Sequence, residues 1–221
     1  MAARAESNRY EHQRQQAIRS AAAVFAEKGF HGASTRDIAE RMGIKQGSLY
    51  YYFKSKEEAL GEVCLYGIKA YVERMKTIAA SDQPFEAKLM ATITSHLTSY
   101  RERNEALKVH NDERLYLPED KRARLKELGS SYRQLLEQVF EEGAEAGVLR
   151  DSIDCHFAAQ AVIGMCNGWG DIIVRDPDLD LFDLIQQCTD LVLNGFVERR
   201  KKKRNGSEAG AAKNSKEPRN H

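Results

Sequence analysis

The ten residues from Lys45 to Lys54 carry side chains well suited to binding a polyanion. They run Lys-Gln-Gly-Ser-Leu-Tyr-Tyr-Tyr-Phe-Lys. Ammonium and hydroxyl groups donate to phosphate oxygens, the glutamine amide can address a base edge, and the glycine lets the backbone come close to DNA. Three consecutive tyrosines point in different directions around a helix, so at least one ring must be partly exposed. The segment favours DNA binding over the alternative, an ordinary helical hairpin with a solvated face.

The preceding residues form the elements that position this segment. Apolar residues recur at spacings of three and four from about residue 9 to 28, which predicts a helix that Gly29 ends by taking a positive φ. Ser34 or Thr35 can cap a short second helix that closes at Gly43. A third helix of about two turns must follow at once. Two short helices separated by a glycine-bearing turn form a helix-turn-helix.

The rest of the chain also has helical patterns. Ser55 and Glu58 have the spacing of a capping box, which opens a helix running to about residue 80, and a shorter helix is expected over residues 104–117. The other helix starts are placed at Pro84, Pro118, Asp154 and Asp180. The sequence therefore predicts an all-α protein of about nine helices, with a three-helix N-terminal domain and a larger C-terminal helical domain.

Composition limits the classes of protein to consider. The chain has 221 residues, of which 42% are hydrophobic and 30% charged, as is typical of a globular protein. No apolar run approaches the ~18 to 20 residues that span a bilayer, so no membrane partner is expected. The polar start resembles no secretory signal, and the four cysteines show no paired spacing. These features predict a reducing, cytoplasmic location.

The formal net charge of +1 hides a separation of charge along the chain. Residues 1–54 hold nine basic and five acidic groups (+4), residues 55–198 hold 16 and 26 (−10), and residues 199–221 hold nine and two (+7). This separation suggests that one end meets a polyanion, and the alternative is chance clustering. Residues 199–221 lack large apolar side chains and are predicted to be a disordered basic tail.

The stretch from Thr35 to Leu60, Thr-Arg-Asp-Ile-Ala-Glu-Arg-Met-Gly-Ile-Lys-Gln-Gly-Ser-Leu-Tyr-Tyr-Tyr-Phe-Lys-Ser-Lys-Glu-Glu-Ala-Leu, resembles the signature of TetR-family transcriptional regulators. Two positions depart from it: Lys45 stands where the family often has a capping Ser or Thr, and Tyr52 where it often has His. The resemblance implies a homodimeric, ligand-responsive repressor that binds a near-palindromic double-stranded DNA operator. Residues 1–54 would be the DNA-binding domain and residues 55–198 the ligand-binding and dimerisation domain.

The resemblance also implies roles for individual residues. Phosphate contacts map to Thr35, Lys45, Ser48, Tyr50, Tyr51 and Lys54, base contacts map to Gln46 and Gly47, and Arg36 is a plausible addition. In this family the last two helices usually form the dimer contact. The small residues Gly164 and Gly168, with Gly170, and the stripe of Phe182, Ile185, Thr189, Val192 and Phe196 would suit such a contact. The alternative for the glycines is tight packing within one subunit.

Polar and aromatic groups within otherwise apolar helices are the candidates for a ligand cavity: His96, Tyr100, Asn111, Arg114, Met165, Asn167 and Trp169. For His96, and for Met165 with Trp169, the alternative is an ordinary place in the core. Residues 109–114 loosely resemble the TetR subgroup that senses acyl-CoA thioesters. Apolar length at Phe85, Leu89, Ile93 and Leu97 beside Arg101, Arg103 and Arg114 would suit an acyl tail and the phosphates of CoA. The alternative is that these arginines are solvated or paired with neighbouring acids.

The sequence offers little support for an enzyme. It contains no GxGxxG, Walker, HExxH or CxxC pattern and no nucleophile elbow. No spacing supports a metal site, and no cofactor is expected. The remaining rival is a non-enzymatic helical adaptor whose basic run at residues 199–204 binds acidic partners; in a repressor the same run would add nonspecific DNA affinity or be a solvated end.

Overall fold

The computed structural model describes the backbone of residues 2–196 and the side chains of residues 7–195. Within this range the chain forms nine α-helices and one short 3-10 helix, which confirms the predicted all-α fold. The helices are α1 (Ala2–Gly32), α2 (Thr35–Met42), α3 (Gln46–Leu49), α4 (Lys56–Ala79), α5 (Phe85–Glu102), α6 (Asn104–Glu113), α7 (Glu119–Glu145), α8 (Cys155–Arg175) and α9 (Leu181–Phe196), with η1 (Arg114–Tyr116) between α6 and α7. The basic tail predicted at 199–221 lies outside the described residues.

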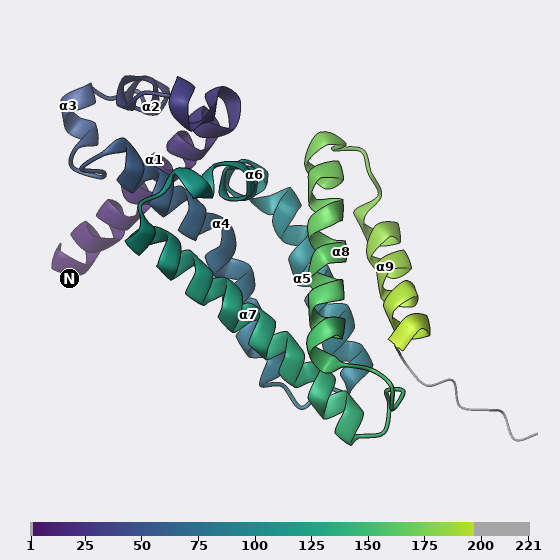
Figure 1. Cartoon of the computed structure of the whole chain (residues 1–221). Coiled ribbons are helices and arrows are strands. Elements are labelled where there is room, and N and C mark those ends of the chain that lie inside the picture. The colour runs from purple at the N-terminus through teal and green to yellow at the C-terminus, as the bar shows by residue number, and fades with distance from the viewer. Residues whose placement is uncertain (1, 197–221) are drawn as a thin grey trace, which may run out of the picture.

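The helices form a small head and a larger body (Figure 1). The head consists of the C-terminal part of α1 with α2 and α3. The long helices α4 and α7 pack along each other and run away from the head, while α8 packs against α5 and α7 and α9 packs against α5. Helix α6 lies where the head meets the body and contacts both α1 and α4. One hydrophobic cluster runs through head and body, because α4 contributes to both.

The predicted local signals are present in the head. Gly29 takes φ 69°, as expected, and the helix resumes for one turn to Gly32 instead of ending there. Ser34 caps α2, and Gly43 ends it with φ 72°. Helix α3 is one turn long, shorter than the two turns expected. Lys45 at its N-cap makes no side-chain capping bond. After Leu49 the amides of Tyr51 and Tyr52 make tighter bonds from residue i to i−3.

Helix α8 differs from the expectation that no segment could span a membrane. Among the described residues it is the one helix long and apolar enough to do so by length and composition. It packs against α5 and α7 within the body. A core helix of a soluble protein has the same length and composition, so this feature alone does not indicate a membrane protein.

Close packing between α5 and α7 gives a testable prediction of stability. A Cβ added at Gly143 would lie 2.7 Å from the Phe85 ring, which is buried against Phe140. We expect Gly143→Ala to lower the free energy of unfolding by ~1 to 3 kcal/mol, because the ring must shift in a packed core. Urea denaturation measures the change.

The matched control is Gly129→Ala on the same helix, where nothing lies within 4 Å of the added Cβ. This variant should be neutral or more stable by up to about 1 kcal/mol, because alanine favours a helix interior. Equal effects of the two substitutions would contradict the packing argument.

Candidate DNA-binding head and effector cavity

The residues predicted to contact DNA come from the start of α2 and from the α3 segment, which adjoin in the head (Figure 1). Leu49 and Phe53 are buried and fix the α3 segment to the core, and Tyr52 packs partly against it, which leaves Tyr50 and Tyr51 pointing outward. Tyr51 is 70% exposed and Tyr50 52%, as the run of three tyrosines requires. The other predicted contacts, Arg36, Lys45, Gln46, Gly47, Ser48 and Lys54, are also exposed, and Thr35 is half-buried.

Gln46 is oriented by a bond to α2. Its amide nitrogen donates to the Thr35 hydroxyl over 3.0 Å, which links the first residues of α2 and α3. The space around the missing Cβ of Gly47 is open to 4 Å. The amide of Gln46 and the backbone of Gly47 therefore lie on an accessible surface, as contacts to base edges require. Base contact itself stays a prediction.

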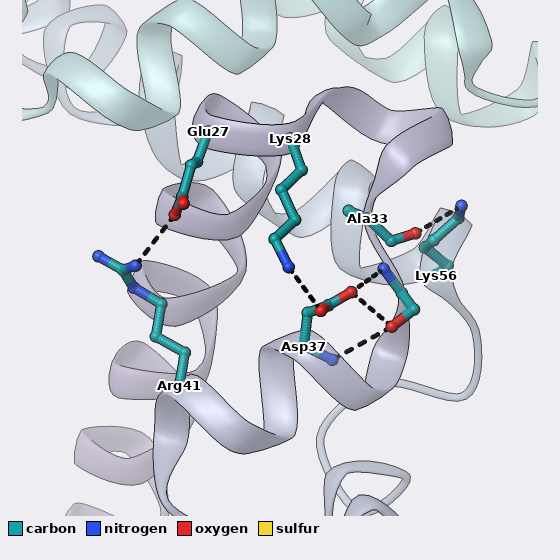
Figure 2. Close-up of polar contacts among 7 residues, drawn as sticks. Glu27, Lys28, Ala33, Asp37, Arg41 and Lys56 are labelled. Atoms are coloured by element: carbon teal, nitrogen blue, oxygen red, sulfur yellow. Dashed lines mark hydrogen bonds and ion pairs between the residues drawn. The ribbon is translucent and has the colours of Figure 1, made fainter.

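A carboxylate at the start of α2 ties that helix to α1 (Figure 2). Asp37 accepts from the Lys28 ammonium over 2.6 Å and from the Ser34 amide over 2.8 Å, and its own amide donates to the Ser34 hydroxyl. The Lys28 ammonium, followed by the Ser34 groups, holds the pKa of Asp37 well below its usual range. The sequence indicated the cap but not Lys28, whose role depends on how α1 crosses α2.

Two further side chains, Lys56 and Arg41, fix the C-terminal end of α1, and Figure 2 draws their contacts with Ala33 and Glu27. The Lys56 ammonium donates to the carbonyls of Phe30 and Ala33 over 2.8 and 3.0 Å and lies 4.4 Å from the centre of the Phe30 ring. Arg41 of α2 lies 3.5 Å from Glu27 of α1. These contacts connect α1 to both α2 and α4.

Tyr10, which the sequence analysis did not single out, braces the tyrosines of the α3 segment. Its ring packs edge-on against Tyr51 at 5.4 Å and is stacked with Tyr52 at 6.3 Å. The Tyr52 hydroxyl donates to Gln13 over 3.4 Å. No local pattern could have indicated these contacts, since about 40 residues separate the partners.

The body contains a cavity of about 910 Å³ lined by residues of α4 to α8. Five of the seven candidate ligand residues line it: His96, Tyr100, Asn111, Arg114 and Asn167. Met165 and Trp169 do not. They lie two positions before and after Asn167, which places both on the other side of α8, and they pack against the core. Their assignment to the cavity was wrong, and the core alternative holds for both.

One wall of the cavity is a connected set of polar side chains, which we call the floor cluster: buried His96, Tyr100 and Tyr132, half-buried Tyr71 and exposed Asn167. The Asn167 carbonyl oxygen accepts from the Tyr100 hydroxyl and from His96 Nε2, each over 3.1 Å. Nδ1 of His96 is then left to accept from the Tyr132 hydroxyl at 3.0 Å. Tyr71 stacks on the imidazole with ring centres 5.1 Å apart.

Burial keeps this cluster uncharged. It lowers the pKa of His96 to about 4, against a smaller opposing effect of the Asn167 bond, and it raises the pKa of Tyr132 well above its ordinary value. Burial likewise lowers the pKa of His110, another cavity residue, to about 4. The floor is therefore neutral at physiological pH, although it is rich in hydrogen-bonding groups.

The cationic side chains of the cavity come mainly from α7. Arg122, Lys126 and Arg133 line it together with Arg114, and two acids, Glu119 and Glu127, oppose these four cations. Nε of Arg122 is buried without a partner among the described residues. The sequence did not single out the α7 cations, because charged residues lie on several faces of this helix. Only the packing of α7 shows which of them line the cavity.

The α5 residues proposed for an acyl tail and for its phosphates have other roles. Phe85, Leu89, Ile93 and Leu97 are buried in the core and do not line the cavity. Arg101 donates to the carbonyls of Pro177 and Leu179. Arg103 donates to the Tyr66 carbonyl and stacks over the Tyr66 ring. Of the three arginines, Arg114 alone lines the cavity.

The predicted dimer residues divide into two sets. Gly164, Gly168 and Phe182 are exposed, and nothing lies within 4 Å of a Cβ added at either glycine. Ile185, Thr189 and Val192 are buried within the subunit, so their assignment to an interface was wrong: this stripe of α9 faces α5. The side chain of Phe196 lies outside the described residues. Gly170 does pack within the subunit, against the Tyr100 ring.

A short segment joins the cavity to the head. Arg114 and Leu115 line the cavity, and the next residue, Tyr116, stacks on Phe30 and packs edge-on against His31 with ring centres 5.9 and 4.4 Å apart. The Lys108 ammonium of α6 donates to the Ala26 carbonyl of α1 over 3.0 Å. A displacement of α6 and η1 by a ligand would therefore be passed to α1.

An exposed helix-turn-helix on a helical body with a large cavity is typical of a ligand-responsive DNA-binding regulator. Residues 17–63 match the model of the bacterial regulatory proteins of the tetR family, and residues 82–196 match the tetracyclin repressor-like C-terminal domain. The chain belongs to the TetR family, as the motif over Thr35 to Leu60 predicted.

Individual relatives are also named as transcriptional regulators. The transcriptional repressor KstR2 of Rhodococcus jostii is 33% identical over 139 residues, which cover 62% of this chain and 68% of the relative. The structure of the ketosteroid regulator KstR2 of Mycobacterium tuberculosis has a TM-score of 0.73 at 25% identity and covers 84% and 95% of the two chains. FadR of Bacillus subtilis, solved with stearoyl-CoA, has a TM-score of 0.70 at 25% identity and covers 82% and 98%.

These relatives favour a transcriptional repressor over both an enzyme and a helical adaptor. In the part of the chain that the structure describes, no group of three or more His, Cys, Asp or Glu side chains could hold a metal ion.

The geometry of the head predicts different effects for two substitutions. We expect Gln46→Ala to change which DNA sequences are preferred, with a loss of ~1 to 3 kcal/mol if the amide makes a bidentate base contact. Tyr51→Phe keeps the ring on Tyr10 but removes a hydroxyl, so it should weaken all operators about equally. Selection from random duplex DNA, followed by affinity measurements on the selected sites, separates the two effects.

Gln134→Ala, at an exposed glutamine of α7, is the matched control and should change neither property. If Gln46→Ala selected the same consensus as the parent, Gln46 would have no part in reading bases.

Proposed function

We propose that this protein is a homodimeric repressor whose two heads bind a near-palindromic operator and which an acyl-CoA thioester releases from DNA. A two-fold dimer presents two α3 segments, which must enter major grooves ~34 to 36 Å apart or a multiple of that distance. Because the partner is chromosomal DNA, we infer a cytoplasmic location.

The observation that carries the effector assignment is that a large cavity has an excess of cationic side chains in its lining. Arg114, Arg122, Lys126 and Arg133 oppose two acids on a cavity of about 910 Å³. Guanidinium groups bind phosphate in bidentate fashion, so these cations suit the phosphates of CoA, while the interior holds the acyl group. The stearoyl-CoA complex of the FadR relative supports a thioester.

The route from effector to DNA follows α6 and η1. A thioester that displaced Arg114 and Leu115 would move Tyr116 against Phe30, and Lys56 holds Phe30 to the start of α4. The distance between the two heads of the dimer would then no longer allow both to bind their half-sites. Such an effector must bind the released form more tightly than the DNA-bound form.

The exposed faces of α8 and α9 are the proposed dimer surface. Phe157, Gly164, Gly168 and Ile172 are exposed along α8, and Phe182 and Leu191 along α9. An apolar face of this extent on two neighbouring helices is typical of a protein interface. The open space at the two glycines lets a partner helix approach closely.

We expect long- or medium-chain acyl-CoAs to lower operator affinity ~5- to 150-fold, the range of a coupling of ~1 to 3 kcal/mol. The measurement is a titration of the protein–operator complex, followed by fluorescence anisotropy, with acyl-CoAs of several chain lengths, free CoA and the free acids. Arg122→Gln should raise the thioester concentration that is needed.

Arg124→Gln is the matched control, because it makes the same change on α7 but faces a different groove. Failure of every thioester to displace operator would reject the acyl-CoA assignment and leave the repressor assignment intact.

We expect Gly168→Leu to raise the dissociation constant of the dimer by about tenfold or more, equal to about 1.4 kcal/mol, because the new side chain would separate the helices. Light scattering over a dilution series measures the oligomeric state. Gly129→Leu, at a similarly open glycine of α7, should leave the dimer unchanged. An unaltered dimer for Gly168→Leu would place this glycine outside the interface.

A further inference from the structure

The N-terminal turns of α1 project beyond the core of the head. Among the described side chains of this helix, Ala17 is the first buried one, whereas Ser7, Asn8 and Arg9 are exposed. In Figure 1 these turns extend away from the body, on the same side of the molecule as α3. Since they add no buried side chain to the core, the surface that they form is accessible to a partner.

Two contacts hold this part of α1 against the α3 segment, which carries most of the predicted DNA contacts. The Tyr10 ring packs edge-on against Tyr51 and is stacked with Tyr52, with ring centres 5.4 and 6.3 Å apart. One turn later, Gln13 accepts a hydrogen bond from the Tyr52 hydroxyl over 3.4 Å. On its other side, an ion pair over 2.5 Å ties Arg14 to α4. The direction of α1 is therefore fixed relative to the exposed surface predicted to face DNA.

Arg9 lies on the side of α1 that meets the α3 segment. It precedes Gln13 by four residues, so the two side chains lie on one face of the helix, one turn apart. Within the part of the chain that the structure describes, Arg9 forms no ion pair. Its guanidinium is therefore an exposed cation that continues the surface of the α3 segment.

The shape of duplex DNA decides which partner fits this surface. A duplex carries one negative charge per about 1.7 Å of its axis, so a duplex docked on the α3 segment presents further phosphates to the neighbouring helix. Arginine binds phosphate through charge-assisted hydrogen bonds, which can be bidentate. Because Arg9 has no carboxylate partner among the described residues, it breaks no ion pair with them when it binds a phosphate.

We propose that the N-terminal turns of α1 are a second DNA-contacting element of each head, in which Arg9 binds a backbone phosphate of the operator. Tyr10 is a positioning residue, whose ring holds Tyr51 toward the same strand. A phosphate contact adds affinity without reading sequence, so this element strengthens binding and leaves the choice of operator to the α3 segment. The inference rests on the proposed binding of an operator and is independent of the effector.

The salt dependence of binding tests the contact. Fluorescence anisotropy would measure the affinity of the full-length protein for the operator selected from random DNA, and for a duplex of unrelated sequence, at ~50 to 200 mM KCl. We expect Arg9→Gln to weaken both complexes ~3- to 10-fold per subunit. The slope of log affinity against log salt should become less steep by about one per subunit, because one counterion fewer is released.

Two matched variants separate a local contact from a general effect of charge. Arg19→Gln makes the same change in net charge on the same helix, but Arg19 is exposed nine residues after Tyr10 and so lies on the opposite side of α1. It should change affinity by less than about twofold and leave the salt slope unchanged. Arg9→Lys keeps the cation, so it should retain the salt slope of the parent. Glutamine has a helix propensity close to that of arginine, so all three variants should fold.

Neutral phosphates locate the contact on the operator. In a scan that replaces single phosphates by methylphosphonates, one replacement should weaken binding of the parent but leave binding of Arg9→Gln unchanged, because the variant no longer uses that phosphate. The consensus selected from random DNA should be the same for the parent and for Arg9→Gln.

The role of Tyr10 is tested through Tyr51. Tyr10→Ala should weaken operator binding, whereas Tyr10→Phe should retain it, because the edge-on ring contact remains. When Tyr10→Ala is combined with Tyr51→Phe, the two losses should sum to less than their separate values, since both act on one phosphate contact. Fully additive losses would show that Tyr10 does not act through Tyr51.

The possible results separate this contact from operator binding itself. Equal effects of Arg9→Gln and Arg19→Gln, an unchanged salt slope for Arg9→Gln, or identical methylphosphonate scans would overturn the contact while operator binding stands. A changed consensus for Arg9→Gln would overturn the phosphate assignment, since it would indicate a base contact. If the parent bound no selected duplex, both the contact and the proposed operator would be rejected.

Discussion

The turn at Gly29 is the constraint on which the relation between head and body depends. Its φ of 69° returns Phe30 to the core, where the ring meets Lys56 of α4 and Tyr116 of η1. A Cβ at this position would lie 3.2 Å from the Glu113 carboxylate of α6, so the turn and α6 lie close together. Contacts at this turn therefore connect the helices of the DNA-binding head to the segment that lines the cavity.

The separation of charge has a consistent physical role. The basic head presents its cations and hydroxyls around α3, and the acidic body extends away from it, so that repulsion from phosphate favours docking by the head alone. Within the acidic body, α7 provides a local excess of cations at the cavity. The net charge of the chain reveals neither feature. Salt screens an electrostatic field beyond about a Debye length, so the field at a site depends on which charges lie near it.

Prediction from the sequence was accurate where the signal is local. Ser34, Gly43, Ser55 and Asp154 act at helix ends through bonds to residues three or four positions away, and all four lie where the patterns placed them. The exposed α3 face follows from the spacing of Leu49 and Phe53 alone. Prediction failed where the partner is remote: Tyr10, Lys28, Lys56 and Arg122 acquire their roles from contacts that no short pattern encodes.

The sequence alone determined the family, the all-α fold and the exposed surface predicted to face DNA, because helix periodicity, caps and a long local motif are properties of neighbouring residues. The tertiary structure decided which face of each body helix is used. It turned Asn167 toward the cavity and Met165 and Trp169 away from it, and it buried the α9 stripe of Ile185, Thr189 and Val192 against α5. An apolar stripe predicts only that a face will be covered, since the gain on burial is non-directional; packing determines whether the same subunit or another molecule covers it.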